Sequence, residues 1–161
     1  MMRKTTVEEL AKEIENAFQE VTYPGDDNLV YDNSGRYLDV TETAQAFKGR
    51  QWKSIPLSVI ALHRDSLPFL TSAAFHFFLP AFLLASLLHP VEADTLNDNL
   101  IYLLAPPELG DNWKDQVLSI ASKVNSKQRA VIISYLKYMM EKEPAMYEDD
   151  AKVAIEFWKT A

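Results

Sequence analysis

His63-Arg64-Asp65 is the densest polar cluster beside the long uncharged stretch of this chain. A histidine next to a carboxylate can act as a general base with an orienting partner, provided that the two side chains come within hydrogen-bond reach in the fold. Closeness in sequence does not establish that geometry. His63 and Asp65 are therefore candidates for general acid–base catalysis, and the competing interpretation is a salt bridge at the surface or at a helix end.

The three histidines, His63, His76 and His89, are equally spaced, and imidazole is a common metal ligand. At about 100° per residue, this spacing turns His76 and His89 to different faces of a continuous helix. We therefore expect no metal site and no cofactor, with His76 as the candidate ligand if a metal binds. A metal-dependent or acid–base enzyme would need His63 and Asp65, with His76 as an optional third side chain, to converge in one concave pocket. The absence of cysteine excludes disulfides, thiolate metal sites and cysteine nucleophiles.

The other patterns that could carry chemistry are incomplete. Residues 25–35 have a composition found in calcium loops, but Val30 occupies the first ligand position of the EF-hand pattern and Thr41 replaces its final Glu. Turn formation explains the same residues. The chain has no GxSxG, HExxH, P-loop or GxGxxG pattern, and its 4 glycines are too few for phosphate-binding loops.

The element that must position these residues is the stretch 67–88, which contains no Asp, Glu, Lys or Arg. Thr71 is a suitable N-cap, and apolar residues then cover every face, as in a fully buried helix or a membrane span. Pro80 lies inside and predicts a kink near residues 77–79. We expect a buried, Pro-kinked central helix, with a membrane anchor at 67–88 as the alternative. The expected core residues are Phe75, Phe78, Leu79, Pro80, Phe82, Leu83, Trp52 and Trp158.

Helical periodicity and capping signals extend the helical prediction to the rest of the chain. Further helices are expected at residues 7–20, 41–48, 55–63, 113–123 and 126–141, and after Glu143-Pro144, with Glu148, Asp149 and Asp150 at the start of the last one. Residues 28–40 suggest either a small β-hairpin or an extended excursion, 91–99 an acidic connection, and 100–105 a helix or a strand. The prediction is a mainly α fold, a helical bundle, with residues 1–161 as a single domain.

The net charge of −7 disfavours nucleic acid and anionic membranes as partners, because phosphate binding requires a basic patch. The N-terminus lacks the apolar region of a secretory signal, so we expect a cytoplasmic protein. With no catalytic constellation, the leading hypothesis is a soluble interaction or regulatory protein with an unidentified protein partner. An immunity-like, toxin-neutralising protein is a narrower form of it, in which surface acids meet a basic partner. The candidate contacts are Glu13, Glu20, Asp26, Asp27, Glu148, Asp149 and Asp150.

Four segments also resemble a family of small uncharacterised bacterial proteins, a domain of unknown function. They are residues 47–52 (FKGRQW), 69–83 (FLTSAAFHFFLPAFL), 125–129 (NSKQR) and 154–158 (AIEFW). The most specific is the second, with the pattern F-L-T-x-x-x-F-x-x-F-L-P-A-F-L. The resemblance implies a helical single domain, and it supplies no activity, ligand or catalytic residue.

Overall fold

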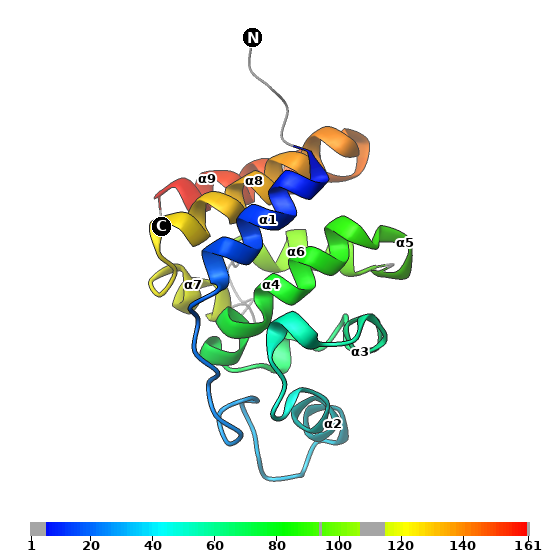
Figure 1. Ribbon diagram of the computed structural model, residues 1–161, viewed down its shortest axis with the longest axis vertical. Coiled ribbons are helices and arrows are strands. Elements are labelled where there is room, and N and C mark those ends of the chain that lie inside the picture. The colour runs from blue at the N-terminus through cyan, green and yellow to red at the C-terminus, as the bar shows by residue number, and fades with distance from the viewer. Residues whose placement is uncertain (1–5, 94, 107–114, 161) are drawn as a thin grey trace.

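The computed structural model describes residues 6–93, 95–106 and 115–160, and most of these residues are helical (Figure 1). This confirms the mainly α fold. In chain order the elements are α1 (Val7–Phe18), α2 (Leu38–Phe47), the 3₁₀ turn η1 (Trp52–Ser54), α3 (Leu57–Leu62), the 3₁₀ turn η2 (Leu67–Phe69), α4 (Ser72–Leu88), α5 (Pro90–Ala93), α6 (Leu96–Leu104), α7 (Asp115–Ala121), α8 (Ser126–Lys142) and α9 (Pro144–Thr160).

Helix α4 is the centre of the molecule, as the uncharged stretch predicts. Thr71 caps it, accepting a hydrogen bond of 3.1 Å from the backbone N–H of Ala74. Pro80 lies inside the helix without ending it, and the kink remains a prediction. In Figure 1, α4 runs across the middle, with α1 and α8 on one side and α3 on the other. The eight residues expected in the core, from α4, η1 and α9, are all buried.

A layer of three helices covers one side of α4. Helices α8 and α9 pack along each other, and α1 lies against both α8 and α4 (Figure 1). Asn125 begins α8 with the reciprocal capping box expected for Asn125 and Gln128. Trp158 of α9 is buried and donates its indole N–H to the Leu104 carbonyl of α6, 2.8 Å away. The buried apolar residues from α1 to α9 therefore form one continuous core cluster.

Residues 28–40 do not form the hairpin that their pattern allowed. In the described part of the chain the only β pairing there is a single antiparallel bridge between Val30 and Leu70. The segment expected as the second strand enters a helix instead, because α2 begins at Leu38 and buries Val40 and Phe47 along one helical face. Apart from this bridge, residues 28–36 form turns and bends, which is closer to the alternative prediction of an excursion than to a hairpin.

Several expected boundaries are also corrected. Most of 91–99 belongs to α5 and α6 rather than to an irregular acidic connection, and 100–104 is helical. Helix α1 ends at Phe18 rather than at residue 20, and α3 is shorter than expected because Pro56 precedes it as the N-cap residue. Helix α9 begins at Pro144, so the acids at 148–150 lie beyond its first turn. Trp113, expected in α7, lies outside the described residues.

The uncharged stretch 67–88 is divided between η2 and the 17-residue α4. Among the described residues, no helix reaches the length and apolar character that crossing a bilayer requires.

Candidate functional site

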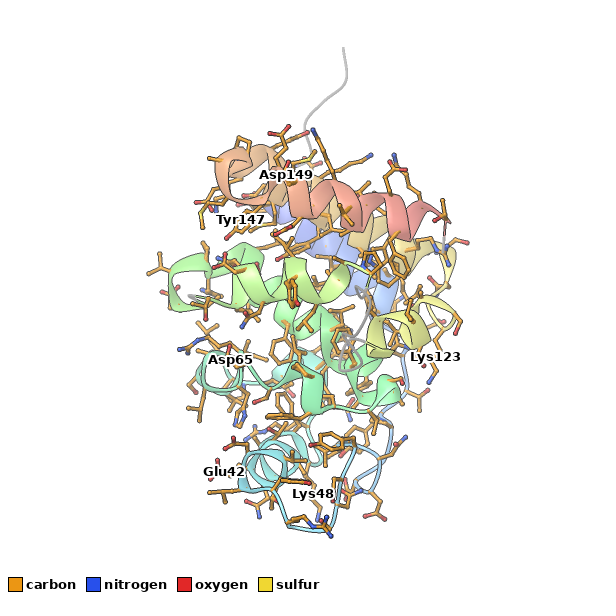
Figure 2. The ribbon with its side chains drawn as sticks, turned by 180° about the vertical axis from the view of Figure 1, so that it is seen from behind. Glu42, Lys48, Asp65, Lys123, Tyr147 and Asp149 are labelled. Carbon is orange, nitrogen blue, oxygen red and sulfur yellow. The ribbon has the colours of Figure 1, made fainter. Side chains whose placement is uncertain are left out.

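The candidate site is a groove between α2 and the chain that runs from the end of α3 into η2. Its volume is ≈ 680 Å³, and we call it the acidic groove. The lining residues are Asp39, Glu42, Gln45, Ala46, Leu62, His63, Asp65, Ser66 and Phe69. Among these residues there are three carboxylates and no lysine or arginine. Figure 2 shows Glu42 and Asp65 on the same side of the molecule, far from Asp149 at the other end.

Helix α2 presents its acids to the groove because its two faces differ. Val40, Thr43 and Phe47 are buried and follow helical spacing, which turns Asp39 and Glu42 outward. Thr43 donates its hydroxyl to the Asp39 carbonyl one turn earlier, 2.8 Å away, so this buried hydroxyl has a partner. The aromatic ring of Phe47 anchors the helix on the core and contacts Phe78 and Phe82 of α4.

His63 forms the floor of the groove. It follows the last residue of α3, and only 9% of the residue is exposed. Its Nδ1 lies 3.2 Å from the hydroxyl oxygen of Ser66, and its ring packs edge-on against Phe47. Burial lowers the pKa of His63, and the negative charge of Glu42 opposes that shift in part. The imidazole is therefore held in its neutral form at neutral pH.

Asp65 stands at the opposite rim and is bound to α6 rather than to His63. Its carboxylate accepts a hydrogen bond of 2.6 Å from the side chain of Asn99. The side chain of Arg64 donates to the Thr95 hydroxyl, directly before α6, at 3.0 Å. It also donates to the Ala61 carbonyl of α3 at 2.9 Å. The bonds to Thr95 and Asn99 hold the turn after α3 against the start of α6, while the carboxylate of Asp65 stays exposed.

One exposed apolar side chain lies in the groove, and two more lie on the segments that form or contact it. Leu62 lines the groove and is 77% exposed. Leu38 of α2 is 70% exposed, and Tyr31, whose backbone N–H donates to the Phe69 carbonyl, is 60% exposed. A large apolar side chain as exposed as Leu62 is not part of the core, and in a concave surface it favours a contact surface.

The three histidines do not converge. His63 and Asp65 line the same groove, whereas His76 lies on α4 and contacts Gln128 and Phe18, and His89 follows the exposed end of α4. The described part of the chain contains no group of three or more His, Asp or Glu side chains arranged to hold a metal ion. The most buried histidine is His63, not His76.

The acid-rich segment 25–35 uses its side chains for turns. Asp32 accepts from the backbone N–H of Ser34 at 2.8 Å, and hydrogen bonds from Ser34 lower the pKa of Asp32. Ser34 in turn accepts from the backbone of Arg36, and Asn33 donates to the Asp27 carbonyl. Turn formation thus accounts for these residues, as the sequence favoured over calcium binding.

Sequence reasoning missed the contribution of α2 to the site. Asp39, Glu42 and Gln45 recur every third residue, which is the spacing of one polar helix face, but the expected start at residue 41 left Asp39 outside the helix. The sequence did not single out Ser66 or Leu62 as candidate site residues either. The exposure of Leu62 has no sequence signal, because it depends on which face of α3 the core covers.

This arrangement defines an all-α protein with an acidic groove on a rigid helical core. The chain belongs to a family of unknown function, DUF6714, whose model matches residues 6–161. The expected resemblance to an uncharacterised family is thereby confirmed over almost the whole chain. No curated protein and no solved structure matches it.

Proposed function

We propose that this protein is an interaction domain that binds a basic segment of a partner protein in the acidic groove. The observation that carries the proposal is the composition of the groove, which Asp39, Glu42 and Asp65 line together with exposed Leu62 and without a lysine or arginine. A segment with lysine or arginine next to an apolar residue complements both features. Charge complementarity would direct its approach, and the apolar contact would be buried on binding.

The contacts that hold both sides of the groove on the core support the proposal. Phe47 holds α2 on the core, and the bond from Asn99 to Asp65 holds the opposite rim on α6. A preformed surface loses less conformational entropy when a partner binds. The proposal treats residues 1–161 as a single domain, which the continuous core cluster supports. It also expects a cytoplasmic protein with no nucleic-acid partner, and the net charge of −7 supports the absence of a nucleic-acid partner.

An immunity-like, toxin-neutralising role is the narrower form of this proposal. The seven acids named as candidate contacts from the sequence are all exposed. None of them lines the groove, although Asp26 lies near the end of α2, because it accepts a hydrogen bond from the Tyr23 hydroxyl, which itself accepts from the Gly49 N–H. Asp149 lies at the opposite end of the molecule from Glu42 (Figure 2). We therefore assign the first contact to Glu42 and Asp65 rather than to Asp149.

The test is a selection of random twelve-residue peptides displayed on phage against the purified, full-length protein. We expect enriched peptides to carry net positive charge and at least one large apolar residue, and to shift the backbone NMR signals of residues 38–46 and 62–69. Val153→Asp is the matched control for Leu62→Asp, since Val153 is an exposed apolar residue on α9. Enrichment of acidic peptides, or loss of binding in Val153→Asp and not in Leu62→Asp, would contradict the proposal.

A hydrolase is the second candidate, because His63 Nδ1 lies 3.2 Å from the Ser66 hydroxyl inside an open groove. In such an enzyme His63 would accept the proton of Ser66 as Ser66 attacks a substrate carbonyl, and would return it to the leaving group as the substrate bond breaks. Water would then hydrolyse the acyl-enzyme and release Ser66. Asp65, the partner suggested by the sequence, is bound to Asn99 instead. Covalent labelling of Ser66 by a fluorophosphonate probe, lost in His63→Ala, would favour this candidate. An unlabelled, folded protein would remove it.

A further inference from the structure

A second concavity, separate from the acidic groove, lies where α1, η1 and α3 meet α4. Its volume is ≈ 370 Å³, within the range of about 300–1,000 Å³ typical of small-molecule sites. Helix α4 lies between α1 and α3 there (Figure 1). Most of its lining is apolar, and we call it the apolar pocket. The apolar lining residues are Trp52, Ile55, Leu57, Ile60, Ala81, Leu84, Ala85 and Leu88.

Part of the wall of the apolar pocket belongs to the buried core, and its edge is exposed. Trp52 is 5% exposed and Ile60 is 2% exposed, whereas Leu88 is 43% exposed. The small side chains of Ala81 and Ala85 on α4 leave the space that larger residues would fill. An apolar ligand would therefore enter a largely preformed site and bury its surface against fixed side chains.

Three polar side chains complete the lining, namely Glu15, Lys53 and His89. Lys53 Nζ lies 5.5 Å from the centre of the Trp52 ring, and no carboxylate of the described residues pairs with it. His89 is exposed, and within the same residues its ring has no hydrogen-bond partner. Lys53 and His89 thus offer N–H groups to a ligand beside apolar walls, and Glu15 is the single acid of the lining.

We propose that the apolar pocket binds a small carboxylate with an aliphatic body, in the class of medium-chain fatty acids. The chain of the ligand lies against Trp52, Ile60 and Leu84, and its carboxylate accepts hydrogen bonds from Lys53 and His89. Glu15 on α1 repels the head group, which orients the carboxylate toward the η1 side and the end of α4. This site is independent of the partner-binding groove.

The test is calorimetric and NMR titration of the full chain with octanoate, octanol and octylamine, each below its micelle concentration. We expect saturable, one-to-one binding of octanoate that shifts the indole N–H signal of Trp52, assigned with a Trp52→Phe variant. Octanol should bind about tenfold more weakly, because it lacks the charge that Lys53 recognises. Equal affinities for octanol and octanoate, tighter binding of octylamine, or no saturable binding would each overturn the proposal.

Two variants distinguish the contribution of the ligand's head group to binding from that of its apolar body. Lys53→Met should weaken octanoate binding about tenfold and leave octanol binding unchanged, while Lys127→Met, a matched exposed lysine on α8, should change neither. Ala85→Leu should fill the pocket and weaken both ligands. If Ala85→Leu fails to fold, the comparison of Lys53→Met with Lys127→Met still tests whether Lys53 binds the carboxylate. Unchanged octanoate affinity in Lys53→Met would overturn the assignment of the head group.

Discussion

His76 donates its Nε2–H to the side-chain oxygen of Gln128, 2.9 Å away and 52 residues later in the chain. The direction follows from the other bonds of Gln128. Its amide nitrogen donates to the Ala17 carbonyl at 3.1 Å, and its oxygen also accepts from the backbone N–H of Asn125 at 3.1 Å. The neutral form of His76 therefore carries its proton on Nε2. One buried amide thus connects the end of α1, α4 and the cap of α8.

Gln128→Ala should destabilise the protein by about 2 kcal/mol, because it removes these bonds and leaves buried polar groups without partners. Lys127→Ala changes the neighbouring exposed residue and should stay within about 0.5 kcal/mol of the wild type. Urea unfolding followed by circular dichroism measures both. Equal stability of the two variants would show that Gln128 does not connect the three helices.

Thr71→Ala should lower the free energy of unfolding by about 1–2 kcal/mol, the usual effect of losing an N-cap. The Thr71 hydroxyl accepts from the Ala74 N–H and donates to the Asn28 carbonyl, 2.9 Å away, so it also holds the extended segment on α4. Thr71→Ser keeps the hydroxyl and should retain most of the stability. A Thr71→Ser variant as unstable as Thr71→Ala would assign the effect to the lost methyl group instead.

Stability should fall above about pH 10 through Tyr135. Burial raises the pKa of Tyr135 well above its ordinary value, and the neighbouring Tyr147 and Asp98 add to the shift, while its hydrogen bond with Ser86 opposes it. The unfolded chain releases this proton near pH 10 while the folded protein keeps it, so deprotonation favours unfolding as pH rises.

Tyr135→Phe should show a shallower alkaline loss of stability and a cost of about 1 kcal/mol at pH 7, where its bond of 2.7 Å to Ser86 is lost. Thermal unfolding at several pH values between about pH 8 and pH 11 measures how steeply the stability of each protein falls with pH. The same slope in both proteins would show that Tyr135 titrates normally.

Stability should also fall as pH drops through about 6.5, because burial lowers the pKa of His63. The unfolded chain then binds a proton that the folded protein does not, so acid favours the unfolded state. In His63→Gln, which keeps a polar side chain beside Ser66, the loss between about pH 7.5 and pH 5.5 should be smaller. Denaturant midpoints at the two pH values give the comparison, and identical losses would contradict the proposed environment of His63.

Sequence patterns predicted the central helix well because its signals are local and strong. The Thr71 cap, the apolar faces of α4 and the Asn125–Gln128 box depend on neighbouring residues, and all three form as expected. Residues 28–40 were harder, since two short runs with Leu, Val and Tyr flank the turn residues 32–35, as in a hairpin. Burial of Val40 and Phe47 against the core selects a helix, and that contact cannot be read from the local pattern.

The candidate site was predictable only in part. His63 and Asp65, which the sequence singled out, line the same groove, and their role there stays a prediction. Their partners could not be predicted, since Asn99 and Glu42 come from elements distant in sequence. The same limit explains why His76 was considered as a metal ligand when its partner is Gln128.

The most direct test of the acidic groove as the binding site is a charge reversal at each end of the molecule. Glu42→Lys should weaken binding of a selected basic peptide at least about tenfold at low salt, while Asp149→Lys, the same change on α9, should leave the affinity within about twofold. Fluorescence anisotropy of the labelled peptide measures both. If Asp149→Lys abolishes binding and Glu42→Lys does not, the partner binds at α9 and the groove is not the site.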